Sequence, residues 1–244
     1  PTLGVSRQSG CALLEIVGEA GLAPPVIACD PANGLLVTPY LSGGPWTRED
    51  AHEARNVERL ARCLRELHAL PPAAGVHDVD FRAQAQRLEA ELGAACDAHE
   101  ATAIEPVVRT AAEAAFELLA RREPSRAICH NDLHHLNVLD DGERLWLVDW
   151  EYGGLGDPIF DLASLACQHE FTAGQRLALL EAYAGASTVP VESLDAACIA
   201  FDYVQWLWYR LWAAMSPAAD SEYVVRAEAL GLRLAGRGGW PDPD

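Results

Sequence analysis

The sequence predicts an α+β fold in which a small sheet-bearing part precedes a mostly helical remainder. Three observations lead to this class: a hairpin pattern near the N-terminus, long stretches of helical apolar spacing, and a short β-rich unit near the middle. The change of pattern at about residue 42 predicts domains of residues 1–42 and 43–244. With 244 residues, 50% of them hydrophobic, the chain is long enough to bury a sizeable core.

A helix and a hairpin are expected at the start of the chain. Residues 7–20 repeat apolar side chains at helical spacing, and the pattern stops at Gly21, before two consecutive prolines. The next two runs, PPVIAC and GLLVTPYL, are rich in residues that favour strands. The sequence DPANG joins them, and it is typical of a tight turn because Asn-Gly tolerates positive φ.

The remainder of the chain is predominantly helical, with one β-rich interruption. Thr47 and Asp50 are spaced as in a capping box, so we expect one helix from there through LRELHAL. Further helical patterns lie near residues 80–98 and 105–122, and the chain returns to helix from Asp157 to about residue 235. In between, RAICH and ERLWLVDW have strand patterns, separated by the polar turn D-D-G.

The charge composition limits the classes of partner. The formal net charge is −18 at pH 7, and all 18 Lys+Arg residues are arginine. Binding to nucleic acid or to an anionic membrane needs a basic surface, so we expect neither. The charge is compatible with a cationic small-molecule substrate.

The apolar runs and the cysteines indicate an intracellular protein. No run approaches the roughly 20 apolar residues of a membrane-spanning helix, and the first ten residues lack a signal-peptide pattern. We therefore expect a soluble, cytoplasmic protein. Its seven cysteines are scattered singly, without a C-x-x-C pair. This spacing fits buried reduced thiols better than a disulfide framework or a zinc site, so we expect all seven to be structural.

The stretch ICHNDLHHLNVLDDGERLWLVDWE, residues 128–151, concentrates the polar residues with catalytic potential. Asp132 follows a short strand, Asn137 lies five residues later, and Asp149 ends another strand. Transfer of a phosphoryl group needs a carboxylate that orients the acceptor, and oxygen ligands for magnesium, which is a hard cation. The three histidines of the stretch also suit zinc, but zinc leaves the spacing of Asn137 and Asp149 unexplained. The pattern therefore favours magnesium-dependent phosphoryl transfer.

The motif H-x-D-x-x-x-x-N followed by D-W-E resembles the catalytic loop and metal-binding motif of the aminoglycoside phosphotransferase and choline kinase superfamily. DWEYGGLGDPIFDLASLA is similar to the metal-loop segment of bacterial choline, ethanolamine and thiamine kinases, and LRELHALP and GLLVTPYL also have counterparts there. The resemblance covers nearly the whole chain from about residue 10. It implies a two-lobed, protein-kinase-like fold, with residues 1–42 as a remnant of the nucleotide lobe and its hinge, and residues 43–244 as the helical C-terminal lobe.

The resemblance also implies roles for individual residues. Asp132 would be the catalytic aspartate, and Asn137 and Asp149 would hold Mg²⁺. The hairpin would end in the hinge that meets the adenine of ATP. There, the Pro39 carbonyl would accept and the Leu41 N–H would donate, because proline has no N–H. Two further residues would support the catalytic loop, namely His130 and Asp161.

The acceptor is expected to be a cationic alcohol. The stretch AFDYVQWLWYRLWAAM has helical length and resembles the late helix from which choline kinases build their ammonium pocket. Aromatic rings attract a quaternary ammonium by cation–π interaction, worth about 0.5–2 kcal/mol per contact. A tryptophan stripe on a helix also fits an ordinary core, so that alternative stays open. The residues expected at the substrate are His134, Trp208, Trp212 and Tyr223, with Phe171 as a further wall. Choline or ethanolamine leads, thiamine follows, and an aminoglycoside is third.

Two parts of such a kinase are missing from the sequence. They are the Gly-rich loop over the phosphates and the lysine on a strand of the nucleotide lobe. The GGLGD segment follows the metal motif, which is the wrong place for that loop. Because the catalytic residues are intact, we expect the chain to be the larger part of an active enzyme, beginning just after the lysine. The alternative is a non-catalytic, pseudokinase-like binding module that keeps the acceptor pocket.

Overall fold

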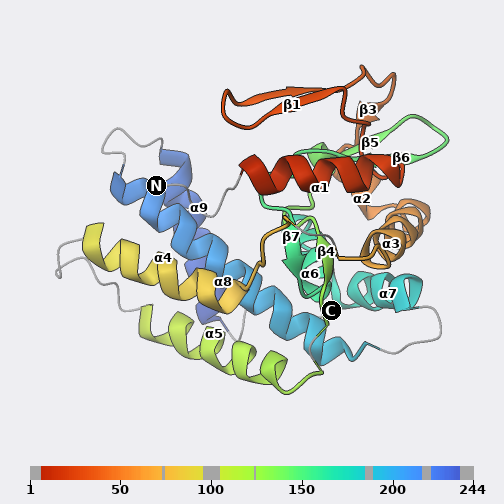
Figure 1. Cartoon of the computed structure of the whole chain (residues 1–244). Coiled ribbons are helices and arrows are strands. Elements are labelled where there is room, and N and C mark those ends of the chain that lie inside the picture. Colours follow the sequence, from red (N-terminus) through yellow and green to blue (C-terminus); the bar gives the residue numbers. More distant parts are fainter. Residues whose placement is uncertain are drawn as a thin grey trace. The chain divides into compact units, whose positions relative to one another are not determined.

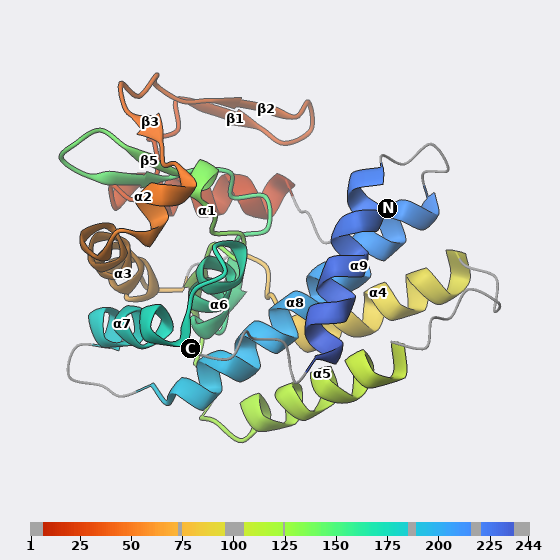
Figure 2. The same cartoon turned by 180° about the vertical axis from the view of Figure 1, so that it is seen from behind.

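The chain, seen here as a computed structural model, forms two compact units. The structure describes residues 7–72, 75–95, 105–123, 125–184, 189–215 and 221–236. The first unit comprises Pro1–Val79 and Pro124–Val191, and the second comprises Asp80–Glu123 and Glu192–Asp244. Figure 1 and Figure 2 show the helices and strands of both units from opposite sides.

The first unit begins with a helix and a hairpin, as the sequence predicts. Helix α1 spans Arg7–Glu19, and the hairpin joins β1, Ala28–Asp30, to β2, Leu35–Val37. The two strands pair antiparallel. The Asp30 carboxylate closes the turn by accepting hydrogen bonds from two backbone N–H groups, which is the usual way in which aspartate stabilises a turn.

The helix expected as one piece from residue 47 is broken into two. Helix α2 spans Arg48–His52 and α3 spans Ala54–His68, because Glu53 between them has an extended backbone with ψ of 124°. The capping box is confirmed. The Thr47 hydroxyl accepts from the Asp50 N–H, and the Asp50 carboxylate accepts from the Thr47 N–H. The cap signal therefore predicted where the helix begins but not where it breaks.

Two small sheets in the first unit carry the polar stretch of residues 128–151. Strands β3 (Gly44–Pro45), β5 (Val138–Asp140) and β6 (Leu145–Leu147) form one sheet in the order β3-β5-β6. Strand β4 (Ala127–Cys129) pairs antiparallel with β7 (Gly154–Gly156) in another sheet. The turn D-D-G joins β5 to β6, so the expectation that it separates RAICH from ERLWLVDW was only half right.

Strand β7 is formed by glycine-rich residues that carry little strand signal. The backbone N–H of Leu155 donates to the His77 carbonyl, and the Leu155 carbonyl accepts from the Val79 N–H, both at 2.8 Å. A Cβ at Gly154 would clash with Val79 and with the His77 carbonyl. Glycine is required there because another backbone segment approaches too closely for a side chain.

Two further helices complete the first unit. Helix α6 spans Ile159–Gln168 and α7 spans Ala173–Ala184. Both views place α7 beside α3 (Figures 1 and 2). The core of this unit consists of large apolar side chains that are almost completely buried, among them Leu60, Leu64, Leu67, Leu133, Leu147 and Leu162.

The second unit is helical. Its helices are α4 (Phe81–Ala95), α5 (Glu105–Ala120), α8 (Val191–Met215) and α9 (Ser221–Ala235). The return to helix expected from Asp157 to about residue 235 is confirmed over the described residues, as α6 and α7 in the first unit and α8 and α9 here. Arg233 pairs with the buried Asp202 at 3.0 Å, which links α9 to α8. Over the residues described, no helix is both long enough and apolar enough to cross a membrane.

The prediction that every cysteine is a reduced thiol was wrong for one pair. Cys11 on α1 and Cys29 on β1 form a disulfide, with their Cα atoms 6.1 Å apart, within the usual range. The spacing along the sequence hides this pair because the two residues are 18 positions apart and meet only when the hairpin lies against α1. The other described cysteines are buried and form no disulfide, namely Cys63, Cys129, Cys167 and Cys198. Cys96 lies outside the described residues.

Candidate active site

The loop of residues 130–137, here called the catalytic loop, follows β4 and brings two predicted site residues together. Asp132 is half-buried, and the buried Asn137 ends the 3-10 turn η1, His135–Asn137. The Asn137 Nδ2 donates to the Asp132 backbone carbonyl at 2.9 Å and lies 3.5 Å from the Asp132 carboxylate. Because the amide nitrogen is committed in this way, the amide oxygen of Asn137 is the atom left to bind a cation.

Asp149 lies two residues beyond the end of β6 and not on the strand itself. The N–H of the preceding residue, Val148, donates to the Asn137 carbonyl at 3.0 Å. Asp149 has a φ of 64°, in the left-handed region that aspartate adopts more readily than most residues, and its side chain is exposed. The hydrogen bond ties together the two segments that carry Asn137 and Asp149.

His130 connects the catalytic loop to the segment before Asp149. It is fully buried, and its Nε2 lies 2.8 Å from the Val148 carbonyl while its Nδ1 accepts from the Asp132 N–H at 3.3 Å. A neutral imidazole donates from one nitrogen and accepts at the other, so this arrangement puts the proton on Nε2. The ring packs against Trp150, with centroids 4.6 Å apart.

Asp161, in the first turn of α6, is fully buried beneath the catalytic loop. Its two carboxylate oxygens accept from the backbone N–H groups of His130 at 2.9 Å and Asn131 at 2.6 Å. Burial raises the pKa of this carboxyl, but the hydrogen bonds from His68 and the loop together outweigh it, so the pKa lies below its ordinary value. Asn131 has a φ of 65°. An ionised Asp161 therefore holds the strained residue directly before Asp132.

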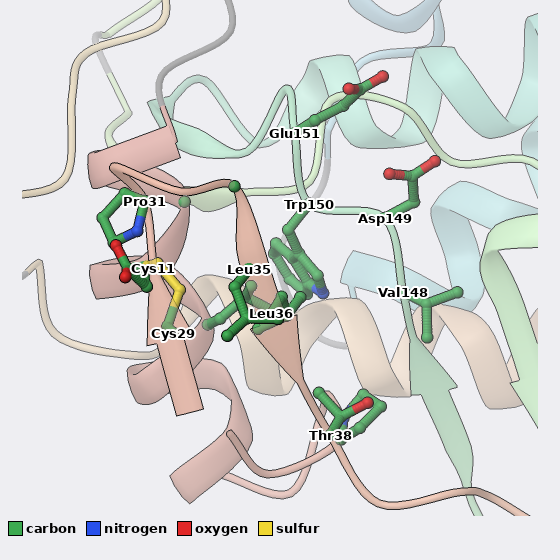
Figure 3. Close-up of a pocket in the computed structure, with 15 residues that line it drawn as sticks. Cys11, Cys29, Pro31, Leu35, Leu36, Thr38, Val148, Asp149, Trp150 and Glu151 are labelled. Carbon is green, nitrogen blue, oxygen red and sulfur yellow. A yellow bond between two sulfur atoms is a disulfide. The ribbon is translucent and has the colours of Figure 1, made fainter. Parts of the chain in front are cut away.

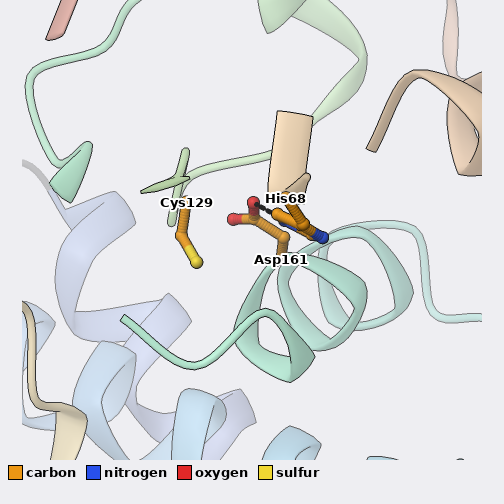
Figure 4. A group of neighbouring side chains, drawn as sticks. All are labelled: His68, Cys129 and Asp161. Atoms are coloured by element: carbon orange, nitrogen blue, oxygen red, sulfur yellow. Dashed lines mark hydrogen bonds and ion pairs between the residues drawn. The ribbon is translucent and has the colours of Figure 1, made fainter. Parts of the chain in front are cut away.

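His68, Cys129 and Asp161 form a cluster of possible metal ligands, with ligand atoms within 4.8 Å of one another (Figure 4). Each of these atoms already has a partner. His68 bonds Asp161 through Nε2 at 2.9 Å and the Tyr183 hydroxyl through Nδ1 at 2.7 Å. The Cys129 thiol donates to the Ala127 carbonyl at 3.5 Å, and burial raises its pKa, so it stays protonated. The cluster fits a hydrogen-bonded brace better than a metal site.

Negative charge gathers around the catalytic loop. Burial, and then the charge of Asp149, raise the pKa of Glu151. Burial also raises the pKa of Asp132, and Asp149 adds to this, while His130 and Asn137 act in the opposite direction. Carboxylates that disfavour one another's charge, together with an amide oxygen, suit a hard cation such as Mg²⁺. Glu151 was not predicted as a site residue from the sequence, although its position as the last residue of the D-W-E motif could have indicated it.

A cavity of about 330 Å³ opens in the first unit between α1, the hairpin and the residues around Asp149 (Figure 3). Most of its walls are apolar, with Leu14, Leu36 and Trp150 among them. Thr38 also lines it, and Thr38 directly precedes Pro39, so the predicted hinge adjoins this cavity. The volume lies within the range of about 300–1,000 Å³ that is typical of small-molecule sites.

The aromatic residues predicted at the acceptor come together in the second unit. Trp208 and Trp212 on α8 have ring centroids 5.7 Å apart, and Tyr223 on α9 lies 6.0 Å from the first and stacks on the second at 6.1 Å. Tyr209 joins them, 5.3 Å from Trp208. We call these four residues the aromatic cluster. The Arg226 guanidinium lies 5.8 Å over the Tyr209 ring, so a cation already rests on one face of the cluster.

The two remaining candidates for substrate contact lie in the first unit. His134 caps η1 by accepting from the Leu136 N–H at 3.3 Å, and its Nε2 is 3.9 Å from the Asp132 carboxylate. Burial lowers its pKa, so it is a neutral neighbour of Asp132 at pH 7. Phe171 is fully buried beside His52 and His169. It offers no open ring face, and we do not keep it as a wall of the acceptor site.

Comparison with known proteins finds relatives of one kind. A family model described as "Phosphotransferase enzyme family" matches residues 11–197. Protein LicA of Haemophilus influenzae is 44% identical over 55 residues, which are 22% of this chain and 21% of that protein. Streptomycin 3''-kinase of Klebsiella pneumoniae is 42% identical over 73 residues, which are 29% of this chain and 26% of that protein. The matched segments thus span about a quarter or less of these two curated relatives.

Solved structures share the fold over almost all of the chain. A choline/ethanolamine kinase family protein from Mesorhizobium loti superposes with a TM-score of 0.78 at 28% identity, covering 94% of this chain and 78% of that one. Choline kinase LicA from Streptococcus pneumoniae gives a TM-score of 0.80 at 23% identity, covering 95% and 81%. These likenesses confirm the predicted protein-kinase-like α+β fold.

Proposed function

The chain belongs to the phosphotransferase enzyme family, and we propose that it transfers the γ-phosphate of ATP to a hydroxyl group of a small cationic metabolite. One observation carries the proposal: Asp132 and Asn137 are hydrogen-bonded to each other, and a backbone hydrogen bond ties them to the segment that ends at Asp149. This is the set of groups that phosphoryl transfer to a hydroxyl requires, one carboxylate for the acceptor and hard oxygens for the metal.

In the proposed reaction Asp132 orients the acceptor. Its carboxylate accepts a hydrogen bond from the substrate hydroxyl, and because burial raises its pKa it is a better proton acceptor than an ordinary surface aspartate. Asn137 and Asp149, joined by Glu151, would hold Mg²⁺, whose charge neutralises the phosphates. The chain contributes mainly positioning and charge, since little covalent chemistry is left to the protein in this reaction.

The cavity beside Asp149 is the proposed nucleotide site. The adenine would meet the hinge, with the Pro39 carbonyl accepting and the Leu41 N–H donating. Both residues are half-buried and follow Thr38 in the cavity wall. A LicA structure solved in complex with AMP has the same fold, with a TM-score of 0.78, which supports a nucleotide in a fold of this kind.

Choline or ethanolamine is the favoured acceptor, and thiamine is next. The aromatic cluster supports a cationic acceptor because tryptophan and tyrosine faces attract quaternary ammonium groups, and because Arg226 already lies over one of its rings. The net charge of −18 favours the same class of substrate. The proteins of the same fold support this choice, since they include a choline kinase and a choline/ethanolamine kinase family protein.

An aminoglycoside is the second candidate acceptor. The identity of 42% to Streptomycin 3''-kinase favours this acceptor. That match covers 73 residues, whereas the match to Haemophilus influenzae LicA covers 55. Aminoglycosides are also cations, so the net charge does not separate the two classes.

The test measures ATP consumption by the purified protein with choline, ethanolamine, thiamine and streptomycin in parallel. We expect turnover with an amino alcohol. The Asp132→Asn variant should reduce kcat by about 10²–10⁴-fold, the range for loss of a positioned proton acceptor, with little change in the KM for ATP. Asp141→Asn is the matched control, since Asp141 is an exposed acid of the D-D-G turn.

Two results would decide against this assignment. Turnover with streptomycin alone would make the chain an aminoglycoside phosphotransferase. If no acceptor supports turnover, and if Asp132→Asn does not alter acceptor binding, the chain is a non-catalytic binding module.

A further inference from the structure

The Cys11–Cys29 disulfide differs from every other described cysteine in its surroundings. Cys63, Cys129, Cys167 and Cys198 are buried and form no disulfide, and burial raises the pKa of Cys63 to about 12, which makes that thiol unreactive. Cys11 and Cys29 are half-buried, and both line the cavity that also contains Asp149. A small reagent that enters the cavity can therefore reach this bond, whereas the four buried thiols are shielded.

The bond joins two elements that differ in how deeply their apolar side chains are buried. Helix α1 is anchored in the core by Leu13 and Val17, both fully buried. The hairpin, by contrast, exposes its apolar side chains: in β2, Leu35 is 52%, Leu36 47% and Val37 38% exposed. Burial thus contributes little to holding the described part of the hairpin. The disulfide supplies a covalent link where packing is weak.

Figure 3 shows how this link relates to the cavity. The disulfide lies at one side, and in this view Leu35, Leu36 and Trp150 lie between it and Asp149. Strand β2 then runs directly into Thr38, another lining residue. A change in how firmly the hairpin is held is therefore a change in a wall of the cavity.

We propose that Cys11–Cys29 is a redox modification site: a small dithiol reduces it, a small disulfide re-forms it, and the bond holds the hairpin against α1 beside the cavity. In the reduction, a thiolate of the dithiol attacks one sulfur and breaks the S–S bond, forming a mixed disulfide. The second thiol of the reagent then displaces that sulfur. Two electrons and two protons pass to the protein, Cys11 and Cys29 become thiols, and the reagent leaves as a cyclic disulfide.

Such a bond suits a reversible role. In reducing compartments disulfides are rare, and those that do occur are mostly transient or redox-sensing. Accessibility through the cavity and location on a weakly packed element are what a reversible bond needs, because attack requires access and opening must not disrupt the core. The core thiols of the first unit, Cys63, Cys129 and Cys167, are left untouched by this exchange.

The first experiment asks whether the bond forms and breaks. Trypsin cleaves after Arg7 and Arg48, which releases residues 8–48 as a peptide that holds Cys11 and Cys29 and no other cysteine. After treatment with oxidised glutathione, iodoacetamide should add nothing to this peptide. After dithiothreitol it should add two groups. Alkylation of both cysteines after the oxidising treatment would overturn the proposal.

The second experiment asks whether the bond holds the hairpin. Chymotrypsin should cleave after Leu35 or Leu36 at least about threefold faster in the reduced protein, because cleavage follows the population of the opened segment. The Cys11→Ser/Cys29→Ser double variant should be cleaved at the fast rate with and without dithiothreitol. Equal cleavage of oxidised and reduced wild-type protein would overturn the proposal, and this comparison involves no mutation.

The effect on ligand binding rests on the proposed function, whereas the two experiments above do not. If the cavity binds nucleotide, reduction should weaken ADP binding by about threefold in the wild type and leave the double variant unchanged, because a smaller fraction of molecules has the wall in place. Faster cleavage with unchanged ADP affinity would overturn the link to the nucleotide and count against the proposed hinge. The reversible disulfide between Cys11 and Cys29, and its effect on the hairpin, would still be established.

Discussion

The catalytic loop and the β1–β2 hairpin belong to the same unit, but different forces hold them. Buried hydrogen bonds hold the loop: Asp161 accepts from two successive backbone N–H groups, and the Ser164 hydroxyl accepts from the Leu133 N–H at 2.8 Å. The hairpin has exposed strand residues, a turn closed by Asp30 at the surface, and one disulfide.

The difference follows from what each segment would do in the proposed reaction. A carboxylate that orients a hydroxyl must be placed to within a fraction of an ångström, and a fully satisfied buried network achieves this. A wall that admits and releases a ligand belongs to the less stable part of a fold. The loop should therefore be sensitive to single buried substitutions, and the hairpin should be sensitive mainly to the disulfide.

The largest effect is expected from Asp161→Asn, which removes part of the buried hydrogen-bond network that holds the catalytic loop. Asparagine keeps one oxygen, so one of the two backbone N–H groups loses its acceptor in a fully buried site. We expect the free energy of unfolding to fall by about 3 kcal/mol, as for other broken buried charge networks. Urea denaturation measures it, and kcat should fall with it because Asn131 and Asp132 are no longer held.

Asp141→Asn is the matched control for this variant. Asp141 also accepts several hydrogen bonds, from Glu143, Arg144 and Trp146, but it is fully exposed. The loss of stability there should be much smaller than in Asp161→Asn, since water replaces lost surface hydrogen bonds. If both variants lose the same stability, burial of the network is not what holds the loop.

A pH dependence of stability is the next largest effect, and it arises behind η1. His169 donates from Nδ1 to the Leu165 carbonyl and accepts at Nε2 from the His135 N–H, so a second proton has no acceptor. Burial lowers its pKa from 6.5 to about 4. The unfolded chain takes up this proton below about pH 6.5, whereas the native protein does so only near pH 4. The free energy of unfolding should therefore fall across this window as the pH is lowered, by up to about 3 kcal/mol.

His169→Gln tests this assignment. The variant should have a flatter dependence between pH 6.5 and pH 4 than the wild type, because the titrating group is gone while the acidic residues remain. Urea denaturation at pH 7, 6, 5 and 4 gives the comparison. An unchanged slope would assign the pH dependence to other groups.

The smallest effect should come from the turn of the hairpin. The Asn33 side chain donates to the Asp30 carboxylate at 2.7 Å at the exposed tip. We expect Asn33→Ala to lower the free energy of unfolding by about 0.5 kcal/mol and to leave turnover unchanged, since exposed hydrogen bonds contribute little. A loss above about 1.5 kcal/mol would mean that the turn stabilises the fold more than an exposed hydrogen bond does.

The features that the sequence predicted correctly depend on residues that are close together in the chain. Helix α1, the hairpin turn and the Thr47 capping box are each encoded within a few positions, and all are present. The motif around Asp132 and Asn137 is similarly local, since a five-residue spacing brings their side chains together. The assignment of roles to these residues stays a prediction.

What the sequence did not predict depends on distant contacts. His68 and Asp161 are 93 positions apart, and the pairing of β4 with β7 needs the glycine-rich segment to approach the backbone near Val79. The disulfide needed the hairpin to lie on α1 before its two cysteines could be recognised as a pair. Glu151 became a candidate only when burial, and then the nearby charge of Asp149, were found to raise the pKa of its carboxyl.

The sequence by itself thus determined the family, the fold class and the order of the candidate catalytic residues, because motif spacing and apolar periodicity are written in neighbouring residues. Tertiary structure alone decided which groups brace the catalytic loop, which strands pair, and which cysteines are joined. Those properties depend on burial and on distances between segments far apart in the chain, and periodicity along the chain carries no information about them.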